Sequence, residues 1–261
     1  LASTDRTTNS GFRSTKTGFS LGTDFEQYEN IYLTPSIKAS FEDIEVQSDA
    51  SSAVKKMEGT FTNLDFGYGI IVDKRNQVFR TSSGHRTKFI QNLPIVIDNS
   101  SIMNGFESTI YRSFSEDVTG VLRFYARSQH GLGNKDVRLT SRVFLPGSRL
   151  RGFNTSRVGP KDGKDWVGGN YASSLGFEAR MPNLLPEAMK TDVSVFLDTG
   201  NVWHVDYSDT VNDGSKIRSA VGVAANVYTV IGPLSIVIAK DLSKGEHDST
   251  ETVNFRLGTS F

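Results

Sequence analysis

Apolar and polar residues alternate one by one along most of this chain, and this period of two constrains the fold more than any other feature. Successive side chains of an extended strand point to opposite faces, so the pattern predicts β-strands rather than helices. We expect strands near residues 13–25, 30–45, 59–72, 84–97, 102–114, 117–130, 166–181, 190–203, 216–229, 232–241 and 251–261. The alternation is ambiguous in 84–97, and Pro35 cannot donate a ladder hydrogen bond inside 30–45.

About eleven strands with this dyad pattern are typical of outer-membrane β-barrels, in which one face of each strand meets lipid and the other meets a wet lumen. Such a barrel also explains why hydrophobic residues make up only 37% of the chain. Short links such as 183–186 and 231–232 alternate with longer ones such as 46–58, 131–165 and 205–215, as expected for periplasmic turns and external loops. A soluble β-sandwich or a lipocalin-like barrel also alternates and stays open on pattern alone.

Composition and motifs argue against several classes of site and function. The absence of Cys excludes a disulfide framework and a thiolate metal site, and a net charge of +0 argues against nucleic acid as the main partner. The four histidines lack metal-ligand spacing, and no nucleophile elbow or phosphate-binding loop occurs. We therefore expect no enzyme, no metal and no cofactor. Residues 1–10 lack an apolar signal-peptide core, so we expect a cleaved leader or a start within a longer protein.

Six motifs in a fixed order resemble the BamA-type family of outer-membrane assembly factors, also called the bacterial surface antigen family. They are Arg151-Gly152-Phe153 followed by Gly159-Pro160, Gly168-Gly169-Asn170 leading to Phe177-Glu178, Phe196 to Trp203 in the pattern Phe-x-Asp-x-Gly-x-Val-Trp, Ile217 to Gly222, Gly232-Pro233-Leu234, and Phe255 to Phe261. The segment Asp73 to Asn76 is similar to a family turn. Pro146 and Arg80 depart from the family pattern, which often has Gly and Pro there, and this puts the loop geometry in doubt.

The resemblance implies an all-β fold, an antiparallel transmembrane β-barrel of sixteen strands. Residues 1–261 would form one partial barrel domain of about eleven C-terminal strands, without the first strands and the periplasmic POTRA domains. Eleven strands cannot close as a standard bacterial barrel, and an open edge in lipid leaves backbone groups unpaired, so we expect a fragment.

In function, the resemblance implies a factor of the bacterial outer membrane that inserts other barrel proteins through a lateral gate without nucleotide. Its partners would be nascent outer-membrane β-barrel proteins, the lipid bilayer, and accessory assembly lipoproteins that bind mainly to the POTRA domains. A two-partner secretion pore is the main alternative, because it shares the Arg-Gly-Phe/Tyr loop. A passive porin is a third.

Two carboxylates and one loop arginine form the first candidate site. The alternation places Glu178 and Asp198 on the non-lipid faces of neighbouring strands. A guanidinium can bridge two carboxylates, and the resemblance assigns Arg151 to this pair. The neighbouring motif residues Gly152, Phe153 and Gly200 complete the expected clamp between loop and lumen. The alternative is that Arg151 is a solvated loop charge above a wet lumen.

The last strand is the second candidate site. The resemblance assigns to a lateral-gate strand the residues Val253, Phe255, Leu257, Gly258 and Phe261. In the family this strand pairs loosely with the first, and Gly258 would mark a kink, because glycine weakens strand interiors. A small lumen-facing residue that makes room for the loop explains Gly258 equally well. The apolar positions could also serve only as lipid-facing packing.

Overall fold

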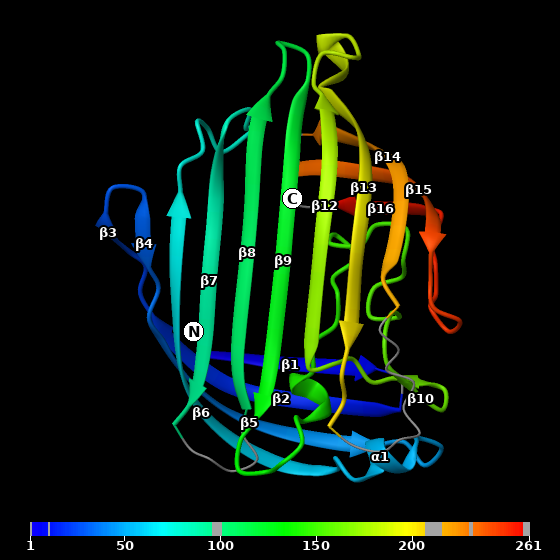
Figure 1. Cartoon of the computed structure of the whole chain (residues 1–261). Helices are drawn as coiled ribbons and strands as arrows, with labels where there is room; N and C mark the ends of the chain where they lie inside the picture. The colour runs from blue at the N-terminus through cyan, green and yellow to red at the C-terminus, as the bar shows by residue number, and fades with distance from the viewer. Residues whose placement is uncertain (1, 10, 96–100, 207–215, 230–231, 258–261) are drawn as a thin grey trace.

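One antiparallel sheet forms almost the whole molecule. The computed structural model describes residues 2–9, 11–95, 101–206, 216–229 and 232–257. The main path of the sheet follows the chain, each strand pairing with the next (Figure 1). Its strands are β1 (Ala2–Asn9), β2 (Phe12–Gly22), β5 (Ser36–Val46), β6 (Gly59–Asp73), β7 (Gly84–Pro94), β8 (Ser101–Ser113), β9 (Thr119–Gly131), β12 (Tyr171–Met181), β13 (Thr191–Trp203), β14 (Arg218–Thr229), β15 (Gly232–Ser243) and β16 (Val253–Leu257).

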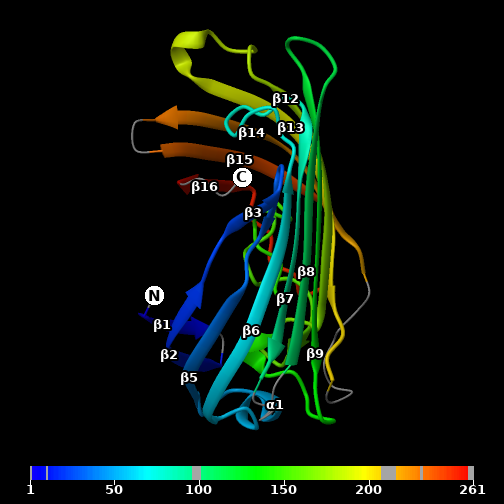
Figure 2. The same ribbon diagram turned by 90° about the vertical axis from the view of Figure 1, so that its left-hand side faces the viewer.

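The sheet curls around a central space, and both of its end strands lie on the same side of the molecule (Figures 1 and 2). β1 and β16 are the two ends of the strand order, and no ladder joins them within the described residues. The three helices found in the described ranges are single turns: α1 (Ser52–Lys55), η1 (Leu139–Ser141) and η2 (Glu187–Met189). Among the described residues, no helix has the length and apolarity that crossing a membrane requires.

All eleven expected strands are present, and the all-β barrel-type fold is confirmed. Among the described residues, the main path of the sheet has one strand more than the eleven expected, namely β1. The alternation did not predict this strand because its residues are mostly Ser, Thr, Asp, Arg and Asn. The start expected at residue 166 was also wrong: β12 begins at Tyr171, and Trp166 belongs to the small ribbon of β10 (Lys161–Asp162) and β11 (Asp165–Trp166).

Pro35 interrupts its strand without changing the register. The segment before it is β4 (Ile31–Leu33), which pairs Leu33 with Ile70 of β6, and β5 resumes by pairing Ser36 with Gly67. β4 also pairs with β3 (Phe25–Tyr28), so the β2–β5 hairpin continues into β3 and β4. A missing backbone donor thus breaks the ladder locally while the two flanks stay aligned.

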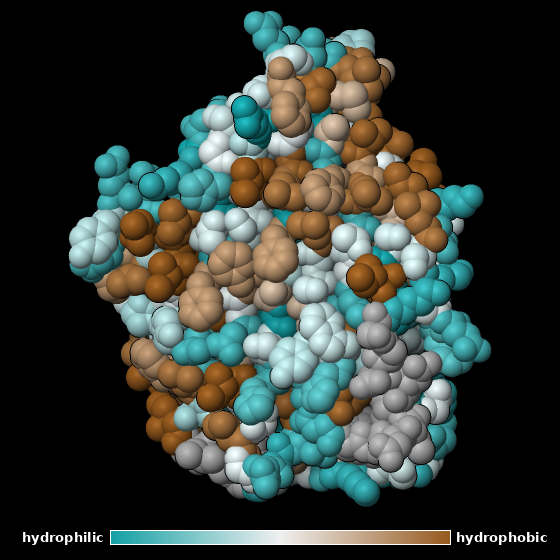
Figure 3. All heavy atoms as spheres, viewed as in Figure 1, coloured by the Kyte–Doolittle hydropathy of each residue, from teal (hydrophilic) through white to brown (hydrophobic). Residues whose placement is uncertain are grey.

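Side chains on the two faces of the sheet differ as the alternation predicts. Phe177 is 48% exposed on the outer face, whereas Glu178, the next residue, is 6% exposed on the inner face. Further apolar side chains on the outer face include Val195, Val223, Ile238 and Phe255. Figure 3 shows apolar side chains gathered across the upper middle of this face, with further apolar groups near the top and at the lower left among hydrophilic residues. A single curled sheet with outward apolar residues and charged groups on its inner face is the arrangement of a membrane barrel and not of a soluble sandwich of two sheets.

Candidate functional site

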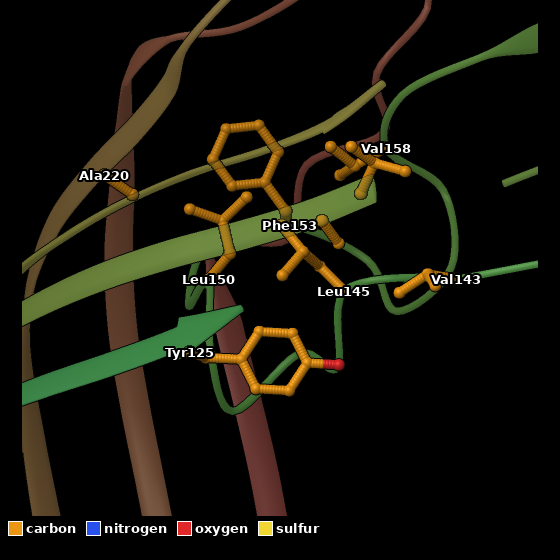
Figure 4. Close-up of a cluster of buried hydrophobic side chains, with 9 residues drawn as sticks. Tyr125, Val143, Leu145, Leu150, Phe153, Val158 and Ala220 are labelled. Atoms are coloured by element: carbon orange, nitrogen blue, oxygen red, sulfur yellow. The ribbon is translucent and has the colours of Figure 1, made fainter. Parts of the chain in front are cut away.

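The long connection between β9 and β12 folds back into the space enclosed by the sheet (Figures 1 and 2). It carries apolar side chains of its own, which pack against the inner wall. The resulting cluster contains Tyr125, Val143, Leu145, Leu150, Phe153, Val158, Ala172, Val202 and Ala220, all buried (Figure 4). Each large apolar side chain buried in this way contributes about 1.5–3 kcal/mol. The loop is therefore a packed element and not a solvated link.

Arg151 lies at the tip of this loop and reaches two acids on the wall. Its Nε and Nη2 atoms donate to Asp198 Oδ2 and Oδ1 at 2.7 and 2.9 Å, and its Nη1 donates to Glu178 Oε2 at 2.7 Å. The backbone N–H of Arg151 also donates to Asp198, at 3.1 Å. Relative exposures of 7% for Arg151, 6% for Glu178 and 2% for Asp198 show that the clamp is buried. Charge-assisted, bidentate hydrogen bonds of this kind are strong and directional.

The register of the wall strands explains why the two acids converge. Glu178 of β12 is opposite Phe196 of β13, so Asp198 is the next inward residue along β13. The guanidinium lies over the ring of Phe196, 3.6 Å from its centroid. Arg123 of β9 donates a second hydrogen bond to Glu178 Oε2, at 2.8 Å. Arg180 Nε lies 3.5 Å from the other oxygen of the same carboxylate. Glu178 therefore has three cationic partners, whereas Asp198 depends on Arg151 alone among the described residues.

Glycines make room for the loop at this wall. Gly152 has φ +89°, and a Cβ there would lie 3.0 Å from Ala239 Cβ and 3.1 Å from Ala220 Cβ. A Cβ at Gly200 would lie 3.1 Å from Leu145 Cδ1. A left-handed backbone and close approach are the two conditions that favour glycine.

The loop tip also pairs with the segment that leads into β16, which the sequence analysis did not foresee. Glu251 N donates to Gly152 O at 3.0 Å, and Asn154 N donates to Ser249 O at 2.9 Å. The side chains of Asn154 and Ser249 are hydrogen-bonded at 2.7 Å, and Phe153 forms an isolated bridge with Thr250. Neither segment alternates, so nothing in the sequence pattern indicated this contact.

A second buried arginine connects the base of the same loop to the opposite part of the sheet. Arg138 lies 3.5 Å from Glu42 of β5, hydrogen-bonds Asn63 of β6, and lies over the ring of Phe61. Glu42 also accepts a hydrogen bond from Ser14 of β2 at 2.9 Å. Arg138 lies in an irregular segment and belongs to no recognisable motif, so this contact could not be predicted from the sequence.

The expected site residues divide into two groups. Arg151, Glu178 and Asp198 meet at the clamp with Gly152 next to Arg151, whereas Phe153 belongs to the apolar cluster beside it and Gly200 lies against Leu145 of that cluster. On β16, Val253 and Phe255 point outward at 45% and 66% exposure, and the backbone of Leu257 pairs with Leu234. Gly258 and Phe261 lie outside the described residues. No group of three or more potential metal ligands occurs in the part of the chain that the structure describes.

Comparison with known proteins agrees with this geometry. Over 240 residues the chain is 27% identical to the outer membrane protein assembly factor BamA of Neorickettsia risticii, covering 89% of this chain and 32% of that protein. A shorter match, 54% identical over 54 residues, covers 20% of this chain and 11% of a SAM50-like protein of Schizosaccharomyces pombe. The chain thus spans about a third of the length of the BamA relative and a smaller part of the other.

Solved structures share the fold. The BamA structure from Haemophilus ducreyi lacking POTRA domains 1–3 aligns with a TM-score of 0.82 at 19% identity, covering 94% of this chain and 54% of that one. CdiB from Acinetobacter baumannii aligns at 0.62 and 12% identity, covering 94% and 41%. The barrel-type sheet, its outward apolar band and the BamA relatives place the chain in the bacterial outer membrane. The model of the Omp85 superfamily domain matches residues 2–261, and the chain belongs to this superfamily.

Proposed function

We propose that this chain is part of the membrane domain of a factor that assembles other β-barrel proteins into the outer membrane. The observation that carries the proposal is the contact between the loop tip and the segment leading into β16, an edge strand in the described part of the sheet. The similarity to an outer membrane protein assembly factor supports the same assignment.

The proposed mechanism uses backbone pairing. An edge strand presents free N–H and C=O groups, onto which an extended segment can add as a further strand. β16 would act as the lateral-gate strand, with Val253 and Phe255 toward lipid and Leu257 in its ladder; Gly258 and Phe261, also assigned to this strand by the resemblance, lie outside the described residues. The clamp at Arg151 would hold the loop, and through Gly152 and Asn154 the loop would hold the start of β16 in place.

Client pairing and lipid burial would supply the driving force, so the proposal requires no nucleotide, no cofactor and no enzymatic step. The partners would be nascent outer-membrane β-barrel proteins and the bilayer, with accessory lipoproteins acting on the POTRA domains.

The test is the level of other barrels in cells whose only copy of the full-length protein carries Arg151→Ala. We expect folded client barrels to fall several-fold while the protein itself is present at its normal level. Arg157→Ala is the matched control, because Arg157 lies in the same loop but is exposed and contacts the Trp166 ring. Normal client levels in the Arg151→Ala cells would contradict the proposal.

A second assay separates assembly from secretion and from passive transport. The full-length protein in lipid vesicles, without nucleotide, should accelerate the insertion of a urea-unfolded barrel protein added from outside. A secretion pore would instead export a soluble polypeptide with no effect on barrel insertion, and a passive porin would show only solute-selective conductance.

A further inference from the structure

A cavity rich in arginine lies beside the clamp. It has a volume of about 190 Å³, and the loop tip and five wall strands enclose it. Its lining includes Arg123, Arg149, Arg151, Arg180 and Arg256 and one carboxylate, Glu178. The clamp accounts for Arg151 and Arg123, and Arg149 pairs with Glu107, but Arg180 and Arg256 are not explained by the clamp.

The charges around this cavity do not cancel. Glu178 accepts hydrogen bonds from Arg123 and Arg151 at 2.8 and 2.7 Å, and Arg180 Nε lies 3.5 Å from the same carboxylate. Asp198 neutralises one guanidinium of this group, and Glu107, 2.6 Å from Arg149, neutralises another. Three carboxylates thus form ion pairs with the five lining guanidinium groups, so the guanidinium groups exceed their ion-paired carboxylates by two.

Arg256 carries one charge of this surplus, and the other arises because Arg180 shares the single carboxylate of Glu178 with Arg123 and Arg151. The Nε atom of Arg180 is buried and has no hydrogen-bond acceptor among the described residues. Arg256 is half-buried; its Nε donates to Asn254 Oδ1 at 2.9 Å, and the described residues include no ion-pair partner for it. The nearby acid Glu251 accepts a hydrogen bond from Asn254 and is not part of the lining. Two cationic groups with unused donors therefore face the same small space.

Neutral donors complete the lining. Ser148 comes from the loop tip, Asn226 from β14 and Ser235 from β15, where Ser235 is the direct partner of Arg256 across the β15–β16 ladder. Forked guanidinium donors match the tetrahedral oxygens of a phosphate group better than they match a single halide. A phosphate monoester carries about −1.5 to −2 charges at neutral pH, which balances the surplus.

From this arrangement we infer that the cavity binds a phosphate dianion, held by Arg180 and Arg256 and by the hydroxyl and amide groups between them. The phosphate is either free inorganic phosphate or the phosphomonoester headgroup of a lipid. In either case it would join β12, the loop tip and β16 and would stiffen the last strand from inside. The inference does not depend on whether the protein inserts other barrels.

Calorimetric titration of the full-length protein in detergent micelles with inorganic phosphate tests the inference. We expect one site, and we expect Arg256→Gln to weaken it at least tenfold, because hydrogen bonds to charged groups are among the stronger ones. Arg127→Gln is the matched control: Arg127 lies on the inner face of β9, two residues beyond Tyr125, but outside the cavity lining. Arg180→Gln is the second variant, should Arg256→Gln not fold.

A second experiment, with lipid, distinguishes free inorganic phosphate from a lipid headgroup. The protein is placed in nanodiscs of phosphatidylcholine with added phosphatidic acid, and bound phosphatidic acid is measured after repurification. Binding of phosphatidic acid without binding of free phosphate, lost in Arg256→Gln but kept in Arg127→Gln, would identify a lipid headgroup. Binding of neither probe, or equal weakening by both substitutions, would overturn the inference.

Discussion

The loop between β9 and β12 is anchored by two buried arginines, and the two anchors differ in kind. Arg151 meets two carboxylates at 2.7 Å each and joins the tip to β12 and β13. Arg138 meets Glu42 at 3.5 Å and the amide of Asn63, and joins the base to β5 and β6. Glu42 keeps a hydroxyl donor from Ser14, whereas Asp198 has no cation other than Arg151 in the described chain. The tip should therefore depend on its arginine more than the base does.

The largest effect is expected for Arg151→Ala. This change leaves Asp198 charged and buried without a cation, with only the backbone N–H of residue 151 as donor, and breaking one side of a buried ion pair costs about 3–5 kcal/mol. Urea unfolding of the full-length protein in micelles should show this loss, and limited proteolysis should open the loop. Adding Asp198→Asn to the variant should restore part of the stability, because it removes the orphaned charge. Loss of under about 1 kcal/mol would show that the clamp is solvated.

Arg138→Ala should cost less, about 2 kcal/mol, because Glu42 keeps its hydrogen bond from Ser14. The same unfolding assay compares the two anchors directly. We expect client insertion to suffer less than in Arg151→Ala, since this anchor is on the side of the loop away from β16. A loss equal to that of Arg151→Ala would remove the distinction between tip and base.

Gly152→Ala should have the smallest effect of the three on stability, about 1–2 kcal/mol in all, most of it from the left-handed backbone. The contacts of the new Cβ with Ala220 and Ala239 should supply the rest of this loss and displace the tip. Gly163→Ala is the matched control, because Gly163 also has positive φ, +57°, but no atom within 4 Å of the new Cβ. If both variants lose the same stability, the tip does not approach the wall closely.

Sequence pattern was sufficient where a residue lies in a regular strand. The alternation around Glu178 and Asp198 placed both acids on the inner face, and the same rule placed Val253 and Phe255 outside. The pattern was insufficient where side chains are uniformly polar, as in β1, because a strand without apolar residues gives no signal of period two.

The contacts between irregular segments were also beyond the sequence. Arg138 and Glu42 lie far apart along the chain and share no motif, and the pairing of Asn154 with Ser249 depends on how two loops fold back. Only Arg151 could be assigned in advance, because its neighbours Gly152 and Phe153 resemble a family motif whose partners are known. Three of the cavity arginines, Arg123, Arg180 and Arg256, lie in strands and the other two in the loop, so their convergence appears only in three dimensions.

The central claim is that a buried guanidinium holds the loop tip inside the barrel, beside the start of β16. The chain has no Cys, so Asn154→Cys with Ser249→Cys introduces a single pair at side chains now 2.7 Å apart. The measurement is the disulfide yield of this variant in native membranes under mild oxidation, with Arg151 intact and with Arg151→Ala. The account predicts cross-linking of most molecules with Arg151 and much slower cross-linking without it. Little cross-linking with Arg151 intact would contradict the docked loop, and equal yields would contradict the role of the clamp.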